Sequence, residues 1–132
     1  MIVGVGTDLL ALNRIQRVFD RFPERFAARI LSEEEQARLV NVVSKVRVVR
    51  FLGMQFCAKE SVSKALGTGM QNGVTFDQIV VGRNRLGQPT VTLNGAAQSR
   101  ASQLGIDCWH LSLSDDSGFI QSVAIAESWS RS

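Results

Sequence analysis

The sequence lacks the features that mark several large classes of protein. No stretch of about 18 consecutive apolar residues, the length that a membrane-spanning helix needs, occurs among its 132 residues, so we expect no membrane span. Its first residues carry no cationic stretch ahead of a long apolar segment, which argues against a secretory signal and makes the cytoplasm the expected location. The two cysteines, Cys57 and Cys108, fit no CxxC or zinc-finger spacing, and we interpret them as small buried thiols in a reducing compartment.

Proline, histidine and tyrosine are scarce as well, with two, one and none. No repeat, low-complexity segment or linker rich in Pro, Gly and Ser interrupts the chain. A hydrophobic content of 45% with 20% charged residues is typical of a folded domain and excludes a disordered one. We therefore expect a single domain over residues 1–132.

The net charge of +3 is unevenly distributed along the chain. Residues 1–66 carry 11 Lys and Arg against 7 Asp and Glu, whereas residues 67–132 carry 4 against 5. Such a bias suits an acidic or phosphorylated partner, but it is too weak to indicate nucleic-acid binding. We expect no nucleic-acid partner.

The spacing of apolar residues predicts helices early in the chain and antiparallel strands late. Ser32 and Glu35 form a capping box that opens one helix, and Pro23 separates the two helices before it. The predicted helices cover about 11–22, 24–30, 32–43, 48–66 and 95–104, and the predicted strands cover 2–7, 78–83, 89–93, 108–114 and 119–127. We expect the opening strand to be buried, and the order of the elements predicts the α+β class.

Four polar residues are candidates for function, and each has an ordinary structural alternative. Glu60 and Lys64 lie one turn apart on the longest predicted helix, which is also the spacing of a common surface ion pair. Asp8 follows the first strand, where an acid often caps the next helix. His110, the only histidine, lies on a predicted strand with no partner that the sequence identifies.

Five arginines recur every three or four residues beside an apolar stripe: Arg14, Arg17, Arg21, Arg25 and Arg29. At 100° per residue they share an arc of about 120° on a helix. They form either a solvated face or a docking surface for an acidic partner. The scarcity of neighbouring acids, which are limited to Asp20 and Glu24, favours the docking surface.

Three sequence blocks, in this order and spacing, resemble a known family. The segments are GVGTDLL at 4–10, FCAKESVSKALGTG at 56–69 and HLSLSDD at 110–116, and Arg29-Ile30-Leu31-Ser32 followed by Glu35 is similar to a further family motif. Together they resemble the holo-acyl-carrier-protein synthase type of 4′-phosphopantetheinyl transferase over essentially the whole chain.

The resemblance implies the fold of that family, with early helices packed on a mainly antiparallel sheet, and a homotrimer with active sites between subunits. It implies transfer of the 4′-phosphopantetheine arm of coenzyme A to a serine of an acidic apo-acyl carrier protein. The products would be holo-carrier and adenosine 3′,5′-bisphosphate, in fatty acid biosynthesis. It also implies a magnesium ion, a hard cation suited to carboxylate and phosphate oxygens.

The resemblance also assigns roles to individual residues. Asp8 and Glu60 match the metal carboxylates, and Lys64 matches the lysine that binds phosphate and assists the leaving group. Either Glu60 or a water on the metal would deprotonate the serine. The residues implied to line the coenzyme A site are Gly67, Thr68, Gly69 and His110, and those implied to dock the carrier are Arg14, Arg17 and Arg21.

Three positions depart from the family pattern, and one of them is Ser114-Asp115, which stands in place of the family's Ser-His after the last motif. Gln55 stands where many members have an arginine, so one phosphate contact is lost unless Arg50, about a turn and a half earlier, supplies it. Cys57 stands where many have alanine. The alternative function is a non-catalytic module that binds a carrier protein or an anion through its arginines and uses no metal.

Overall fold

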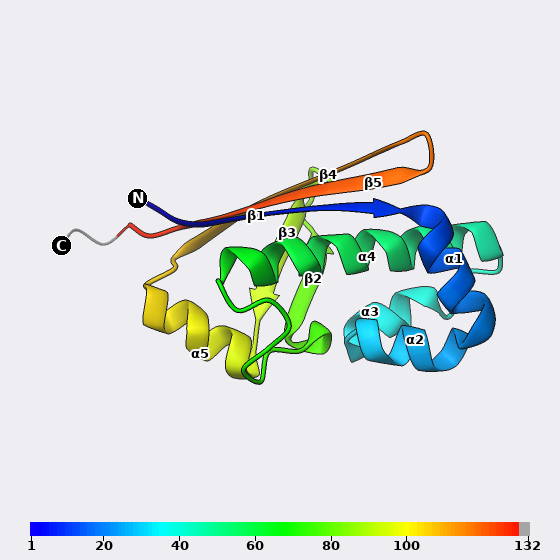
Figure 1. The fold of residues 1–132 in the computed structure, drawn as a ribbon, viewed down its shortest axis with the longest axis horizontal. Helices are drawn as coiled ribbons and strands as arrows, with labels where there is room; N and C mark the ends of the chain where they lie inside the picture. The colour runs from blue at the N-terminus through cyan, green and yellow to red at the C-terminus, as the bar shows by residue number, and fades with distance from the viewer. Residues whose placement is uncertain (130–132) are drawn as a thin grey trace.

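The strand that begins the chain pairs with the strand that ends the fold. In the computed structural model, which describes residues 1–129, β1 (Ile2–Ala11) lies antiparallel to β5 (Phe119–Glu127), and β5 pairs on its other side with β4 (Cys108–Asp116). The long helix α4 (Lys45–Ala65) lies along one face of this β1-β5-β4 sheet (Figure 1). We call the opposite face of the sheet its outer face.

Two glycines allow α4 to approach β1 closely. A Cβ atom at Gly4 would stand 2.0 Å from the carbonyl oxygen of Ala65, and one at Gly6 would stand 1.8 Å from that of Ser61. Any larger side chain would push the strand away from the helix, because packed heavy atoms do not approach so closely. Gly4 and Gly6 thus seat β1 on α4 and place Asp8, further along the strand, beside the same helix.

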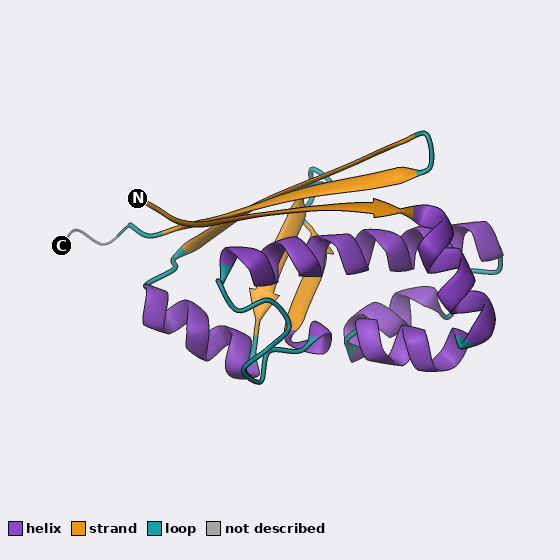
Figure 2. Ribbon diagram, in the orientation of Figure 1, coloured by secondary structure: helices purple, strands orange, loops and turns teal. Residues whose placement is uncertain are grey.

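Three short helices occupy the end of the molecule where β1 finishes. They are α1 (Leu12–Arg21), α2 (Pro23–Ile30) and α3 (Glu33–Leu39), and they cluster beside the first half of α4 (Figure 2). Pro23 takes the first position of α2, where a backbone N–H is not needed. The predicted capping box is confirmed: the Glu35 N–H donates to Ser32 Oγ at 3.2 Å, and the Ser32 N–H donates to Glu35 Oε1 at 2.8 Å.

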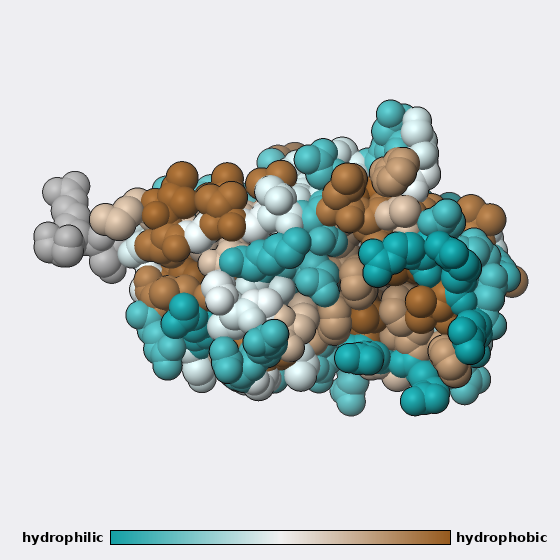
Figure 3. Space-filling model, in the orientation of Figure 1, coloured by the Kyte–Doolittle hydropathy of each residue, from teal (hydrophilic) through white to brown (hydrophobic). Residues whose placement is uncertain are grey.

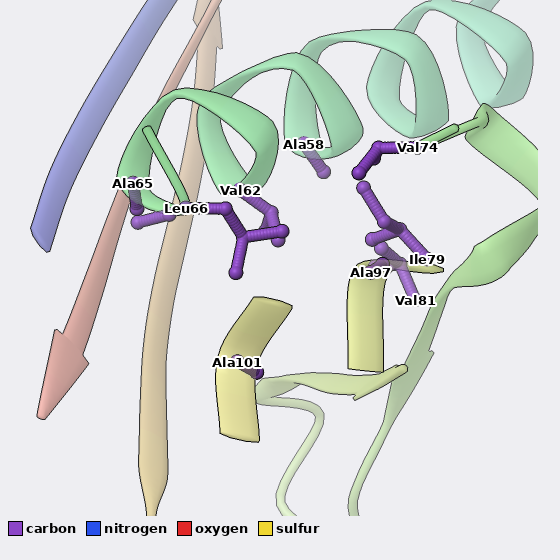
Figure 4. Packing of buried hydrophobic residues seen from close by; sticks show 10 residues of the cluster. Ala58, Val62, Ala65, Leu66, Val74, Ile79, Val81, Ala97 and Ala101 are labelled. Carbon is purple, nitrogen blue, oxygen red and sulfur yellow. The ribbon is translucent and has the colours of Figure 1, made fainter. Parts of the chain in front are cut away.

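A second sheet and a further helix cover the other side of α4. After the turn η1 (Phe76–Gln78), strands β2 (Ile79–Arg83) and β3 (Pro89–Leu93) form an antiparallel pair that leads into α5 (Gly95–Leu104). Ala58 and Val62 of α4, together with Leu66 just after its end, belong to one buried cluster with residues of α5 and β2 (Figure 4). A second cluster joins the middle of α4 to β1, α1 and α2.

The predicted α+β class is confirmed, but the opening strand is not buried as expected. It runs to Ala11 rather than ending at residue 7, and it forms the edge of its sheet. Successive side chains of a strand point to opposite faces, so Gly6, Asp8 and Leu10 face α4 whereas Val5 and Leu9 lie on the outer face, 55% and 67% exposed. Figure 3 shows apolar surface over the strands near the end where the termini lie.

Other boundaries differ for local reasons. The helix predicted over 32–43 ends at Leu39, and α4 begins at Lys45 rather than 48 because Ser44 caps it by accepting from the Arg47 N–H at 3.4 Å.

The strands form two separate sheets rather than one. No helix within residues 1–129 is both long and apolar enough to cross a membrane.

Candidate active site

Asp8 and Lys64 lie together where β1 crosses the last turns of α4. Lys64 Nζ donates to the carbonyl oxygen of Thr7 at 2.9 Å and to Asp8 Oδ1 at 3.2 Å. The Asp8 side chain is 16% exposed and that of Lys64 is 50% exposed. The ammonium group thus lies between β1 and solvent, and its two hydrogen bonds leave one of its three N–H bonds for a ligand.

Glu60 lies one turn before Lys64 and is half-buried. Burial raises the pKa of its carboxyl group above the ordinary value, the negative charge of Asp8 raises it further, and Lys64 opposes both effects. Two carboxylates that repel each other at a partly exposed edge are stabilised by a divalent cation placed between them. The oxygen-only donor set of Asp8 and Glu60 therefore fits a hard ion such as magnesium.

The buried thiol of Cys57 links α4 to β1 and β5 next to Asp8, a role that the sequence did not predict. Its thiol donates to Ser122 Oγ at 3.3 Å and to the carbonyl oxygen of Asp8 at 3.5 Å, while the Ser122 hydroxyl donates to the Cys57 carbonyl oxygen at 2.7 Å. Burial raises the pKa of the thiol to about 11, so it stays protonated at neutral pH. The prediction of small buried thiols is confirmed for Cys57, whereas Cys108 is only half-buried.

The loop of Gly67, Thr68 and Gly69 begins where α4 ends, close to Lys64 in the chain. The N–H of Gly67 donates to the carbonyl oxygen of Lys64 at 3.0 Å, and that of Gly69 donates to Ser63 at 3.1 Å. Both glycines have positive φ, +80° and +57°, which favours residues without a side chain. These two N–H groups terminate the helix and are not free to bind a ligand.

His110 lies on the other side of the sheet from Asp8. It pairs with Ile125 of β5, which pairs with Val5 of β1, whereas Asp8 pairs with Ser122 beneath α4. The alternation of strand side chains therefore puts His110 on the outer face. A single subunit does not bring His110 to the Asp8, Glu60 and Lys64 group.

Arg50 lines a cavity of about 520 Å³ that contains three further arginines, Arg38, Arg47 and Arg83. We call it the arginine cavity. Phe51, nine residues before Glu60, also lines it, and at 100° per residue this is half a turn away from Glu60 around the helix. The cavity therefore lies on the opposite side of α4 from the two carboxylates. Sequence spacing did not reveal this group because its arginines come from α3, α4 and β2.

Gln55 forms part of the wall of the arginine cavity. Its side chain is 4% exposed, and its Nε2 donates to the carbonyl oxygen of Val81 at 3.3 Å. Its Oε1 is buried without a hydrogen-bond partner in the described part of the chain. Arg50, the expected substitute for the missing arginine, forms an ion pair with Asp115 at 3.1 Å on the same rim.

The arginines of α1 remain available to a partner. Arg14, Arg17 and Arg21 are exposed, and none of them forms an ion pair with a carboxylate of residues 1–129. The nearby Asp20 is instead paired with Lys45 at 2.5 Å. Arg25 and Arg29 belong to α2, beyond Pro23, so the break that the sequence predicted there separates them from the three arginines of α1.

Comparisons with known proteins agree with this arrangement. Residues 4–126 match the family model of the 4'-phosphopantetheinyl transferase superfamily. A holo-[acyl-carrier-protein] synthase from Vibrio parahaemolyticus is 42% identical over 127 residues, which cover 96% of this chain and 98% of that protein.

Solved structures give the same result. The holo-[acyl-carrier-protein] synthase of Neisseria meningitidis superposes with a TM-score of 0.85 at 37% identity, over 96% of this chain and 99% of that one. The enzyme of that name from Bacillus anthracis, in complex with CoA (3',5'-ADP), gives a TM-score of 0.78 at 34% identity, over 97% and 98%. The resemblance carried by the three sequence blocks is confirmed, and the chain belongs to the 4'-phosphopantetheinyl transferase superfamily.

Proposed function

We propose that this protein transfers the 4′-phosphopantetheine arm of coenzyme A to a serine of an apo-acyl carrier protein, as a magnesium-dependent step of fatty acid biosynthesis in the cytoplasm. The observation that carries the proposal is the half-buried Glu60 carboxylate beside Asp8, with Lys64 hydrogen-bonded to the same aspartate. The reaction forms a bond between the serine Oγ and the β-phosphorus of coenzyme A. It breaks the bond to adenosine 3′,5′-bisphosphate, which departs with the bridging oxygen.

Asp8 and Glu60 would hold the magnesium ion, which when bound neutralises negative charge on the pyrophosphate. Lys64 presents its remaining N–H to a phosphate oxygen and stabilises the charge that develops on the leaving group. Glu60 would accept the serine proton.

The arginine cavity supports a binding site for the adenosine bisphosphate part of coenzyme A. Arg38, Arg47, Arg50 and Arg83 bring four positive charges around one cavity, which suits a ligand with several phosphates. A neighbouring cavity of about 610 Å³ includes His110 and shares Arg83, Pro89 and Leu113 with it. Two of the residues implied to bind coenzyme A, Arg50 and His110, thus lie around adjoining cavities.

A homotrimer would join the two halves of this site. Asp8, Glu60 and Lys64 lie on one side of α4 and the arginine cavity lies on the other, so one subunit does not offer both to one ligand. The outer face of the sheet exposes apolar side chains, among them Val5, Leu9 and Phe119, 55%, 67% and 50% exposed. Burial of this face between copies would remove apolar surface from water and set one copy's carboxylates against the next copy's arginines.

The carrier protein would dock on α1. Arg14, Arg17 and Arg21 offer unpaired positive charge at the end of β1 that follows Asp8. An acidic carrier held there would bring its serine towards Asp8 and Glu60, while coenzyme A occupies the arginine cavity of the next copy.

The test is a transfer assay with coenzyme A, apo-carrier and magnesium, read by the mass of the intact carrier. We expect a gain of one phosphopantetheine arm, and a loss of rate of at least ~100-fold for Asp8→Ala or Glu60→Ala, because metal ligands supply several kcal/mol. Glu34→Ala, at an exposed position of α3, is the matched control and should retain the rate. Carrier binding without any mass gain would instead favour the non-catalytic module.

A further inference from the structure

Three metal-ligating side chains meet on the outer face of the sheet, near the termini. Cys108 and His110 are two residues apart on β4 and share that face, and Glu127 of β5 is the register partner of Cys108. Cys108 Sγ lies 3.7 Å from His110 Nε2, and His110 Nε2 lies 3.2 Å from Glu127 Oε1. All three ligating atoms lie within 4.8 Å of one another.

These separations match those of ligands around a tetrahedral ion. With metal–sulfur and metal–nitrogen bonds of about 2.3 and 2.1 Å, tetrahedral angles set sulfur and nitrogen about 3.6 Å apart, and nitrogen and oxygen about 3.4 Å apart. The observed distances of 3.7 and 3.2 Å therefore need only small side-chain adjustments.

We propose that Cys108, His110 and Glu127 bind a borderline transition-metal cation, Zn²⁺ in preference to Mg²⁺, with water as the fourth ligand. A thiolate and an imidazole select zinc over hard cations, whereas the oxygen-only pair of Asp8 and Glu60 favours magnesium. The two sites thus differ in ligand chemistry as well as in the face of the sheet that they occupy.

The surroundings of Glu127 prepare it as a ligand. Trp129 Nε1 donates to Glu127 Oε1 at 3.3 Å, which fixes the orientation of the carboxylate. Such outer partners orient the ligands of metal sites. In the single subunit the His110 side chain is 56% exposed and that of Glu127 is 33% exposed, which leaves room there for the ion and for a water ligand.

Spacing along the chain did not reveal this site, because Glu127 comes from the neighbouring strand and only the pairing of β4 with β5 brings it to Cys108. The metal site includes His110, which the resemblance also assigns to coenzyme A, but the inference is tested apart from the transfer reaction. Its three ligands belong to one subunit, and its test needs neither coenzyme A nor carrier.

The test is titration of the whole protein with Co²⁺, a spectroscopic substitute for zinc, followed by thiolate-to-cobalt charge-transfer absorption. Cys57 provides the matched control, since its thiol is fully buried and hydrogen-bonded to Ser122. We expect the band in the wild type and in Cys57→Ser, and its loss in Cys108→Ser. In Glu127→Gln we expect Co²⁺ to bind at least ~10-fold more weakly, because even outer partners of metal sites contribute 10–100-fold to affinity.

Zn²⁺ should abolish the band at equimolar amounts, whereas a large excess of Mg²⁺ should leave it. Thermal unfolding of each variant without metal establishes that the fold is retained. Absence of the band in the wild type, its persistence in Cys108→Ser, or its removal by Mg²⁺ would each overturn the proposal.

Discussion

The ammonium nitrogen of Lys59 lies 2.6 Å from Glu35 Oε1, and both side chains are sealed from solvent, 0% and 1% exposed. Lys59 also donates to the carbonyl oxygens of Ile30 and Phe76, and Glu35 Oε2 accepts from the Val81 N–H. This buried ion pair thus joins α4 to α2, α3, η1 and β2, with its hydrogen-bonding capacity largely used.

Lys59→Met should lower the free energy of unfolding by about 3–5 kcal/mol, because it leaves a buried carboxylate without its counter-charge. Glu35→Gln should also destabilise strongly, and the double variant should lose less than the sum of the two. Urea denaturation measures all three. Lys45→Met, which breaks the exposed pair with Asp20, is the control and should have a far smaller effect; simple additivity of the buried pair would contradict this account.

Glu60→Gln should stabilise the fold near neutral pH while it abolishes transfer. Burial and the charge of Asp8 raise the pKa of Glu60 in the folded protein, so the folded state favours the protonated carboxyl. The ionised carboxylate therefore costs stability, and this cost grows as the pH rises above the ordinary value of 4.5.

The difference in unfolding free energy between Glu60→Gln and the wild type should shrink towards zero below pH 4.5, where the unfolded state is protonated as well. Urea denaturation of both metal-free proteins at several pH values measures it. A stability gain that is independent of pH would show that packing, and not charge, is responsible.

Light scattering should give a mass of about three times 14.5 kDa at micromolar concentration. Val5→Glu, which places a charge on the outer face of the sheet, should shift the mass towards the monomer and reduce transfer with it, because the two halves of the site would separate. Val43→Glu is the control, since Val43 is 97% exposed but lies in the connection before α4, outside the sheet. A monomeric wild type with full activity would refute the shared site.

Reversal of charge on α1 should weaken the recognition of the carrier and leave that of coenzyme A nearly unchanged. Arg14→Glu combined with Arg21→Glu should raise the KM for carrier far more than that for coenzyme A, since surface charges act mainly on encounter. The difference should shrink with added salt, as the Debye length falls from ~10 Å at 0.1 M to ~3 Å at 1 M.

Reversal of Arg25 and Arg29, which lie on α2 beyond Pro23, provides the comparison and should have a smaller effect. Steady-state kinetics with each substrate varied in turn measures both variants. If both KM values stay unchanged in the α1 variant, Arg14, Arg17 and Arg21 are only a solvated face.

Local signals in the sequence predicted most elements of this fold. Ser32 and Glu35 formed the expected capping box, and Pro23 separated α1 from α2, because such features depend on neighbours within one turn. The partners of Lys59 were not predictable in this way, since Ile30, Glu35 and Phe76 converge on it only after α4 has packed against three other elements.

Only those residues of the candidate site that share one helix or one sequence motif were predictable. Glu60 and Lys64 share a face of α4, and the link from Lys64 to Asp8 agrees with the roles that the family resemblance assigned. The arginine cavity was missed because no periodicity relates Arg38 and Arg83 to Arg50. The expectation that the opening strand is buried was wrong. Its β-branched residues suit a protein core, but they suit equally well an outer face that a second copy could cover.

The adjacency of Lys59 and Glu60 in α4 has a dynamic consequence. Local opening of a protein spares segments whose groups are held by many buried contacts. The Lys59 side chain is among the most firmly held groups of the molecule, and Glu60 follows it in the same helical turn. Amide hydrogens around residue 60 should therefore exchange with solvent only through global unfolding, so that the Glu60 carboxylate keeps its position for as long as the protein stays folded.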